Sequence, residues 1–318
     1  MSQAETKPRA IRQQETNISF DDISHPGLDE LVPSRYALKV GEIDVLVVSD
    51  GVLSLPGAML GHNADPAVRS AWLENMFQPP DVLEWALNVV VVRSGDRTIL
   101  VDAGMGMEFP DLPRSGRLAQ RLAAAGIDLA AVTDVVLTHM HMDHIGGLLV
   151  DGVRDRLRPD LRIHLATAEA EFWASPDFSR VSMPPGFPDA LRRTAKRFLN
   201  EFGSYLRPFE SEYEVAPGVL IQRTGGHTPG HSVVRLASGG DRLMFAGDAI
   251  FPVSFEHPEW HNGFEHDPEE ATRVRLRLMR ELAATGEWLM ATHMPFPSVG
   301  RVAVAGDLFR WVPAWWDY

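Results

Sequence analysis

Apolar runs and amphipathic stretches alternate along most of the chain. Runs rich in Val, Ile and Leu predict strands at residues 36–40, 43–49 and 132–138. Two further runs flank Ser94-Gly95-Asp96 within residues 88–102, which predicts a tight hairpin. Because the runs at 88–102 and 132–138 are continuously apolar rather than alternating, we expect their strands to be buried on both faces.

Three other stretches carry apolar residues at helical spacing. Ser115 is expected to cap a helix that ends at Gly126, and residues 189–202 are expected to form a second helix. A third helix is expected at residues 267–284, which begin with an aspartate and a proline, residues that suit an N-cap and a first helical turn. The order of strands and helices predicts an α/β fold with two sheets sandwiched between helices.

An internal similarity suggests two related halves. Residues 88–102 and residues 231–248 both contain a strand, a Gly-Asp-Arg turn, a second strand and a final aspartate. We therefore expect the two halves to present Asp102 and Asp248 at the same edge of a sheet.

Composition narrows the class of protein. The 318 residues include no cysteine, which excludes disulfides, cysteine nucleophiles and cysteine-bound metals. The formal net charge of −13 argues against nucleic acid as the main partner, because phosphate binding requires clustered Lys and Arg. No apolar run approaches the ~18 residues of a membrane span and no signal peptide is visible, so a cytoplasmic protein without a membrane span is expected. Residues 1–35 are expected to form an N-terminal arm, and residues 36–318 a single domain.

The strongest chemical signal lies just after the strand predicted at residues 132–138. His139, His141, Asp143 and His144 follow that strand, which places them on a loop at a sheet edge. An extended backbone directs the rings of His139 and His141 to one side, while Asp143 and His144 reach a second point. Four metal-binding side chains within six positions predict a metal site.

Three more candidate ligands occur later in the chain. His227 precedes a predicted strand, Asp248 ends one, and His293 follows a short strand at residues 288–291. A single zinc ion takes three or four ligands. The candidates exceed that number, which predicts a site for two metals.

In this order, the motifs resemble those of the metallo-β-lactamase-fold hydrolase superfamily, from about residue 36 to the C-terminus. The resemblance implies an α/β fold, an αββα sandwich of two mixed β-sheets flanked by helices. It also implies two divalent ions, with Zn²⁺ favoured by the ligand types and Mn²⁺, Co²⁺ and Fe²⁺ left open. The implied ligands are His139, His141 and His227 for one ion, Asp143, His144 and His293 for the other, and Asp248 as the bridge between them.

Differences between branches of the superfamily narrow the resemblance further. The absence of cysteine excludes the β-lactamases with a cysteine ligand, and those that use only His and Asp lack the bridging carboxylate that Asp248 supplies. His141 stands where redox di-iron relatives have glutamate, and the acidic chain disfavours RNA-processing members. The long N-terminal arm and the aromatic tail at residues 301–318 are most similar to the lactonase and methyl parathion hydrolase branch.

The resemblance implies a dinuclear hydrolase. A hydroxide that bridges the metals would attack the carbonyl of a lactone such as an acyl-homoserine lactone, or of an ester with a hydrophobic substituent. Asp143 would carry a proton to the leaving group, and Asp248 would hold both metals. Two alternatives stay open: a phosphotriester or aryl-ester hydrolase resembling methyl parathion hydrolase, and a non-catalytic metal-binding protein. A homodimer is expected, with no nucleic acid and no membrane as partner.

Other residues are candidates for supporting roles. Asp102 either orients a ligand imidazole or is a turn carboxylate, and His231 either joins the same network or starts a strand, the latter being favoured. A histidine-rich loop with His257, His261 and His266 is expected to be a surface loop near the pocket rather than a third metal site. The residues expected to line a hydrophobic substrate pocket are Met142, Phe172, Trp173, Phe178, Phe187, Tyr205, Phe251, Phe255 and Phe296.

Overall fold

Two seven-stranded mixed sheets form the centre of the molecule. The computed structural model describes residues 32–106, 112 and 114–315. The first sheet is antiparallel from β1 to β4 and parallel from β4 to β7. Its strands, in spatial order, are β1 (Arg35–Val40), β2 (Ile43–Pro56), β3 (Val82–Ser94), β4 (Arg97–Val101), β5 (Asp134–Val136), β6 (Arg162–Ala166) and β7 (Leu206–Phe209).

In the second sheet, as in the first, an antiparallel hairpin is followed by a strand that pairs with it in parallel. Only β11 and β12 pair in parallel, and the other neighbours are antiparallel. Its strands are β8 (Glu212–Ala216), β9 (Val219–Arg223), β10 (Ser232–Ser238), β11 (Asp241–Phe245), β12 (Trp288–Met290), β13 (Gly300–Ala305) and β14 (Leu308–Pro313). Asp102 follows β4 and Asp248 follows β11, as the internal similarity predicted.

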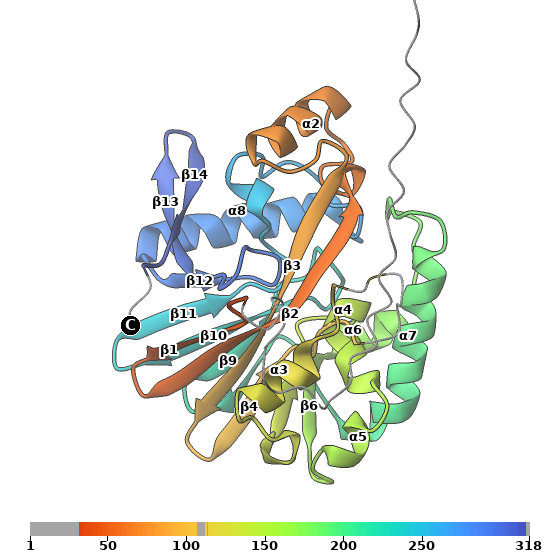
Figure 1. The fold of residues 1–318 in the computed structure, drawn as a ribbon, viewed down its shortest axis with the longest axis vertical. Helices are drawn as coiled ribbons and strands as arrows, with labels where there is room; N and C mark the ends of the chain where they lie inside the picture. Colours follow the sequence, from red (N-terminus) through yellow and green to blue (C-terminus); the bar gives the residue numbers. More distant parts are fainter. Residues whose placement is uncertain (1–31, 107–111, 113, 316–318) are drawn as a thin grey trace, which may run out of the picture. The chain divides into compact units, whose positions relative to one another are not determined.

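Helices cover the outer faces of both sheets, which makes the αββα sandwich that was expected (Figure 1). The long helix α8 packs on the second sheet, and α3 and α7 pack on the first. The α-helices of the described residues are α2 (Pro66–Asn75), α3 (Leu118–Ala124), α4 (Met142–Ile145), α5 (Val153–Arg156), α6 (Thr167–Ala174), α7 (Phe187–Phe202) and α8 (Pro268–Thr285).

The run of four valines in β3 explains why no polar–apolar alternation was visible in the sequence. Val90 and Val92 point into the layer between the two sheets, while Val89 and Val91 point into the layer under the helices. Successive side chains of a strand face opposite sides, so both faces of this strand lie in the core. The predicted hairpin, β3 to β4, is confirmed by its antiparallel register, with Ser94 opposite Arg97.

Two local predictions have different outcomes. The Asp267 side chain accepts a hydrogen bond from the Glu270 N–H at 3.1 Å, which confirms the N-cap of α8. Ser115 does not cap a helix. Its hydroxyl donates to the Leu112 carbonyl at 2.9 Å and closes a turn, and α3 begins only at Leu118.

The largest omission of the sequence analysis lies between residues 52 and 87. Prolines and glycines obscured the pattern there, yet β2 continues to Pro56, β3 begins at Val82, and α2 lies between them. These long strands pair along their whole length, from Asp44 opposite Arg93 to Pro56 opposite Val82.

The domain boundary stays a prediction. The described residues from Ser34 onward form one compact unit, whereas most of the predicted arm at residues 1–35 lies outside the described residues. None of the described helices is both long and apolar enough to cross a membrane.

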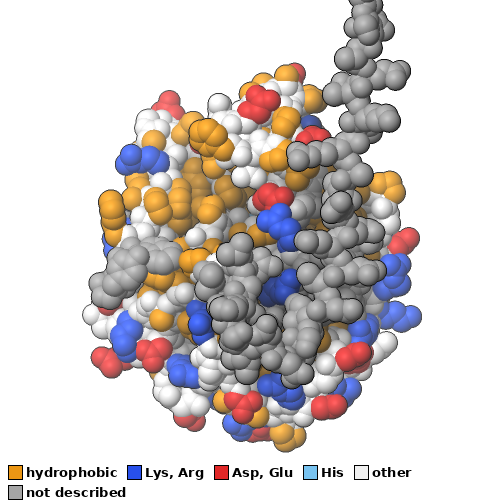
Figure 2. Space-filling view, in the orientation of Figure 1, with side chains coloured by type: hydrophobic (Ala, Val, Ile, Leu, Met, Phe, Trp, Pro, Cys, Tyr) orange, Lys and Arg blue, Asp and Glu red, His pale blue; other side chains and the backbone are white. Residues whose placement is uncertain are grey.

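The hairpin of β13 and β14 carries exposed apolar side chains. Figure 2 shows hydrophobic side chains on the face where this hairpin lies, and Val304, Leu308 and Val312 are among the exposed residues. Strand β14 is the edge of its sheet, so its outer backbone groups are free of a neighbouring strand of that sheet.

Candidate metal centre

Loops from both sheets bring the candidate ligands to one edge of the sandwich. His139 and His141 lie between β5 and α4, and Asp143 and His144 belong to the single turn of α4. His227 lies in the turn before β10. Asp248 and His293 follow β11 and β12, the parallel pair of the second sheet. All seven candidate ligands fall into groups close enough to hold metal ions, and only Asp143 is partly exposed.

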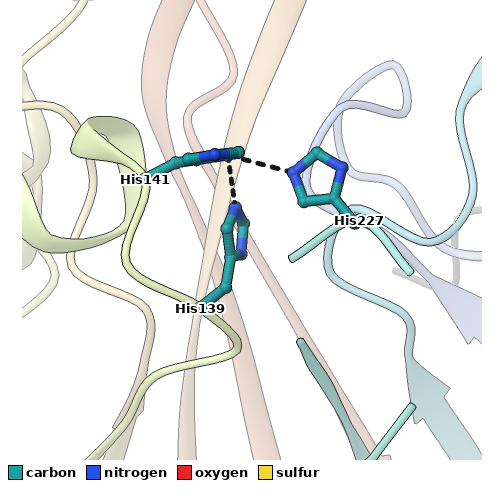
Figure 3. Close-up of side chains that lie close together, drawn as sticks. All are labelled: His139, His141 and His227. Atoms are coloured by element: carbon teal, nitrogen blue, oxygen red, sulfur yellow. Dashed lines mark hydrogen bonds between the residues drawn. The ribbon is translucent and has the colours of Figure 1, made fainter. Parts of the chain in front are cut away.

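The first group consists of three histidines whose nitrogens converge (Figure 3). His141 Nδ1 lies 3.0 Å from His139 Nε2 and 3.0 Å from His227 Nε2. Burial lowers the pKa of His139 and of His227 well below 6.5, and it lowers the pKa of His141 to about 3. The imidazoles are therefore neutral, and each offers a lone pair of the kind that a divalent metal binds.

The second group joins Asp143, His144 and His293. Asp143 Oδ2 lies 3.5 Å from Nε2 of His144 and 3.5 Å from Nε2 of His293. The Asp248 carboxylate reaches both groups, since its Oδ2 lies 3.0 Å from His293 Nε2 and 3.4 Å from His227 Nε2. The Asp248 carboxylate therefore lies between the two groups.

Unpaired buried atoms show that this arrangement fits metal ions. His144 Nε2 and Asp248 Oδ1 are both buried without a hydrogen-bond partner. A buried polar atom without a partner is costly, and a divalent cation would satisfy both atoms at once. Burial lowers the pKa of His144, but the carboxylates of Asp248, Asp143 and Asp102 raise it well above 6.5 overall. The surrounding charge therefore favours a cation at this point.

Asp102 lies behind His144. Its Oδ2 accepts from His144 Nδ1 at 2.8 Å, and its Oδ1 accepts from the Thr138 N–H at 2.8 Å. The carboxylate thus touches a candidate ligand directly and does more than close a turn.

His231 and the Ala86 carbonyl contact two other candidate ligands, Asp248 and His293. His231 Nε2 accepts from the Asp248 N–H at 3.1 Å, and its Nδ1 donates to the Thr224 hydroxyl at 2.8 Å. The structure therefore connects His231 to the network, although the sequence analysis favoured a strand-starting role. His293 Nδ1 donates to the Ala86 carbonyl at 2.9 Å, which leaves Nε2 facing the cluster.

Sequence reasoning missed two buried polar residues near the site. The Asn88 amide donates to the carbonyls of Thr292 and Met294, on either side of His293, at 2.8 and 2.7 Å. Glu169 is fully buried between the two loops that carry the first three histidines. The sequence could have indicated Asn88, because a polar residue directly before four valines is unusual in a buried strand. No feature of the neighbouring sequence indicated Glu169.

A narrow, largely apolar cavity of about 20 Å³ opens onto the cluster. His141, Asp143, Asp248 and His293 form its polar part. The described apolar residues that line it are Leu53, Leu55, Trp85, Leu112, Met142, Phe187, Leu191 and Phe264. Of the residues predicted to form a substrate pocket, Met142 and Phe187 line this cavity. Trp85 and Phe264 were missed, Trp85 because it belongs to the unrecognised start of β3.

Other predicted pocket residues lie around the cavity rather than in its lining. The Phe251 ring stacks on His293 with centroids 5.5 Å apart. The rings of Phe172, Trp173 and Phe178 surround His266 at 4.7, 6.2 and 5.4 Å, and His266 lies 5.7 Å from the His141 ring.

Three predicted pocket residues are placed elsewhere. Phe255 packs against Trp311, 5.8 Å between centroids, because the short turn that carries it faces the α8 side of the second sheet. Phe296 packs into the layer between the sheets. Tyr205 lies beyond the C-terminal end of α7, whose 16 residues span about 24 Å from Phe187 at its start.

The histidine-rich loop does not assemble a third metal group among the described residues. His257 stacks on Trp260 at 4.0 Å, His261 lies 5.7 Å from His62, and His266 joins the aromatic side chains near His141. The structure thus separates the three histidines.

Comparisons with known proteins agree with this fold and cluster. A sequence profile for the metallo-beta-lactamase superfamily matches residues 84–285. A ribonuclease Z of Mycobacterium bovis is 29% identical over 178 residues, covering 50% of this chain and 55% of the relative, so the chain spans about half of that protein. An N-acyl homoserine lactonase of a Bacillus species is 22% identical over 224 residues, covering 64% of this chain and 80% of the relative. The solved structure of AidC, a dizinc quorum-quenching lactonase, superposes with a TM-score of 0.82 at 26% identity, covering 90% of this chain and 99% of that chain.

Proposed function

Since the chain belongs to the metallo-beta-lactamase superfamily, we propose that it is a dinuclear metal-dependent hydrolase that opens lactones or cleaves esters with a hydrophobic substituent. One observation carries the choice of substrate. The cavity above the cluster is apolar, and no Lys or Arg occurs among the described residues that line it. A neutral substrate with an apolar tail suits such a cavity, whereas the anionic groups of a larger substrate would find no basic side chain along its described lining.

The lining of this cavity also helps to choose between the substrate classes of the relatives. The ribonuclease Z match would favour a nucleic-acid substrate, which needs basic side chains for its phosphates. The described lining of the cavity offers no Lys or Arg for this purpose. The lactonase AidC and the Bacillus lactonase are the relatives whose substrate class agrees with it.

We propose that His139, His141 and His227 hold one metal, that Asp143, His144 and His293 hold the other, and that Asp248 bridges them. Two bound divalent ions, Zn²⁺ in our proposal, would lower the pKa of a water molecule and polarise the ester oxygen. Nitrogen and carboxylate donors without sulfur suit Zn²⁺ and also Mn²⁺, Co²⁺ or Fe²⁺.

Asp143 is the residue proposed to move a proton. Its side chain is 12% exposed and lines the cavity, while the other candidate carboxylate, Asp248, is 4% exposed. In its ionised form Asp143 can accept the proton that the attacking water loses and return it to the leaving alkoxide. In a lactone the leaving oxygen stays tethered, so its protonation prevents the ring from closing again.

Proton release from a long-chain acyl-homoserine lactone tests this function directly. Each hydrolysed lactone yields one carboxylic acid, which a pH-stat records. Metal-loaded protein is expected to release acid rapidly, and both chelated protein and the His227→Ala variant are expected to be inactive. Metal-loaded protein that releases no acid from lactones or carboxylic esters would refute the proposal.

An aryl-ester or phosphotriester hydrolase is a second candidate. The rings of Trp85, Phe187 and Phe264 line the cavity and would contact an aryl substituent. Turnover of an activated aryl phosphotriester in the absence of lactone turnover would favour this candidate. A non-catalytic metal-binding protein would bind metal and hydrolyse none of these substrates.

We also propose that the protein is a homodimer. The exposed Val304, Leu308 and Val312 give β13 and β14 an apolar surface that a second copy would cover. Sedimentation equilibrium would decide between monomer and dimer.

A further inference from the structure

Glu169 has an unusual set of partners for a glutamate in a short helix. Its side chain is fully buried in α6 and lies in contact with two distant loops. Oε1 accepts from the Met140 N–H at 2.9 Å and from Trp173 Nε1 at 2.8 Å. Oε2 accepts from the Thr228 hydroxyl at 2.6 Å and from the Gly230 N–H at 2.9 Å.

The loop partners of Glu169 are neighbours of the three-histidine group. Met140 stands between His139 and His141, so its N–H fixes the backbone that directs both rings. Thr228 is the residue after His227, and Gly230 follows two positions later. One carboxylate therefore connects both chain segments that supply this group.

Close packing between α6 and the His227 loop makes the connection rigid. A Cβ atom at Gly230 would lie 2.3 Å from the Glu169 nitrogen and 2.4 Å from the Glu169 Cβ. Only glycine allows this approach, so the loop backbone lies directly against the helix. The Trp173 indole, one turn further along α6, fixes the orientation of the Glu169 carboxylate.

The chemistry of these contacts requires a carboxylate. All four partners are donors, and an ionised carboxylate accepts four hydrogen bonds while donating none. A glutamine would turn an NH₂ group toward two of the donors, and at least one buried N–H would lose its partner, because only the Thr228 hydroxyl can also accept.

We infer that Glu169 is a positioning residue that sets the spacing of His139, His141 and His227 and thereby determines the affinity of the three-histidine metal site. This inference depends on the proposed function only in requiring that metals occupy the cluster. The second group is held by other residues, with Asp102 behind His144 and the Ala86 carbonyl behind His293. Loss of Glu169 should therefore weaken one of the two sites selectively.

A Co²⁺ titration of metal-free protein tests the inference without any substrate. Visible absorption reports Co²⁺ binding, and competition with a chelator gives the affinity of each equivalent. The His227→Ala variant identifies the absorption of the second site alone. Glu169→Gln and Thr228→Val remove contacts of the carboxylate, while Thr228→Ser keeps the hydroxyl and is expected to restore binding.

Asp134→Asn is the matched control for a general loss of stability. Asp134 is also a buried carboxylate with several partners, among them His164 at 2.8 Å and Thr133 at 2.7 Å. It begins β5, whereas His139 lies beyond the other end of that strand. Its replacement is expected to lower the melting temperature and leave both Co²⁺ affinities unchanged.

We expect Glu169→Gln and Thr228→Val to lower the affinity of the three-histidine site about 10- to 100-fold, with the second site unchanged. Wild-type affinity at both sites in Glu169→Gln, or an equal loss at both sites, would overturn the inference. If Glu169→Gln does not fold, the Co²⁺ affinities of Thr228→Val and Thr228→Ser are compared instead. Equal affinities of the three-histidine site in these two variants would overturn the inference. Wild-type protein that binds no Co²⁺ would instead refute the proposed function.

Discussion

Asp102 Oδ2 lies 2.8 Å from His144 Nδ1, and this contact turns the opposite nitrogen of the imidazole toward Asp143 and Asp248. Asp102 adopts a positive φ of 60°, a conformation that residues other than glycine rarely take. This backbone conformation places the Asp102 carboxylate behind His144, which supports a role for Asp102 in the proposed metal site.

Replacement of Asp102 by asparagine is expected to weaken the metal held by Asp143, His144 and His293. The amide is uncharged, so it stabilises the Nδ1–H tautomer of His144 less well, and a loss of about 10- to 100-fold in metal affinity is typical of such changes. Metal content per chain after dialysis would measure the effect. Asp96→Asn, at a side chain that is 96% exposed, is the control and should retain both metals. Full metal content in Asp102→Asn would contradict the prediction.

Metal removal is expected to lower the stability of the folded protein. Without a cation, His144 Nε2 and Asp248 Oδ1 remain buried without a hydrogen-bond partner, 3.4 Å from each other. A metal that binds only the folded state, at a concentration 100 times its Kd, adds about 2.7 kcal/mol to the free energy of unfolding. Melting curves with added Zn²⁺ and with a chelator would reveal the difference. Identical melting temperatures would indicate that the folded cluster does not bind Zn²⁺.

A buried carboxylate away from the cluster is expected to make stability depend on pH. Asp50 accepts hydrogen bonds from the N–H groups of Met105, Gly116 and Leu118 at 2.7, 3.3 and 2.7 Å. Burial raises the pKa of Asp50 from 3.8 to about 6, although these hydrogen bonds lower it. Between these two pH values the folded protein holds a proton that the unfolded chain has released.

The contribution of Asp50 to the free energy of unfolding should therefore be fully present below pH 4 and lost as the pH rises through 6. A pKa difference of this size corresponds to about 3 kcal/mol. Urea denaturation of metal-free wild type and Asp50→Asn between pH 4 and 7 isolates this contribution. The stability difference between the two proteins should change with pH across this interval, and a constant difference would contradict the assignment.

The sequence predicted the cluster well because its ligands carry a local signal. His139, His141, Asp143 and His144 fall within one loop and one helical turn, directly after a strand. The other candidates also lie beside strands, and parallel pairing brings the ends of β4 and β5, and of β11 and β12, to the same edge. Local spacing and strand order together were enough to expect one site.

The cavity and the supporting residues could not be predicted in the same way. Leu53 and Trp85 meet only because β2 and β3 pair far beyond the residues that looked like strands. Glu169 bonds to Met140 and Thr228, which are 29 and 59 residues away in the chain. Tyr205 was predicted to line the pocket from its place in the sequence. It lies beyond the C-terminal end of α7, whereas Phe187, which lines the cavity, lies at the N-terminal end of that helix. Such relationships depend on tertiary packing and leave no periodicity in the sequence.

Phe187 should set the preference for an apolar substrate tail. It begins α7, lines the cavity and contacts Phe264, with ring centroids 5.9 Å apart. In Phe187→Ala the substrate loses apolar contacts worth about 1–3 kcal/mol, which is about 5- to 150-fold in kcat/KM for a long-chain lactone. A short-chain lactone, which does not reach the ring, should be affected little. Phe309→Ala, at a half-buried phenylalanine of β14, is the matched control and should leave both substrates unchanged. An equal loss of kcat/KM for both chain lengths in Phe187→Ala would show that the ring supports the metal centre rather than the substrate.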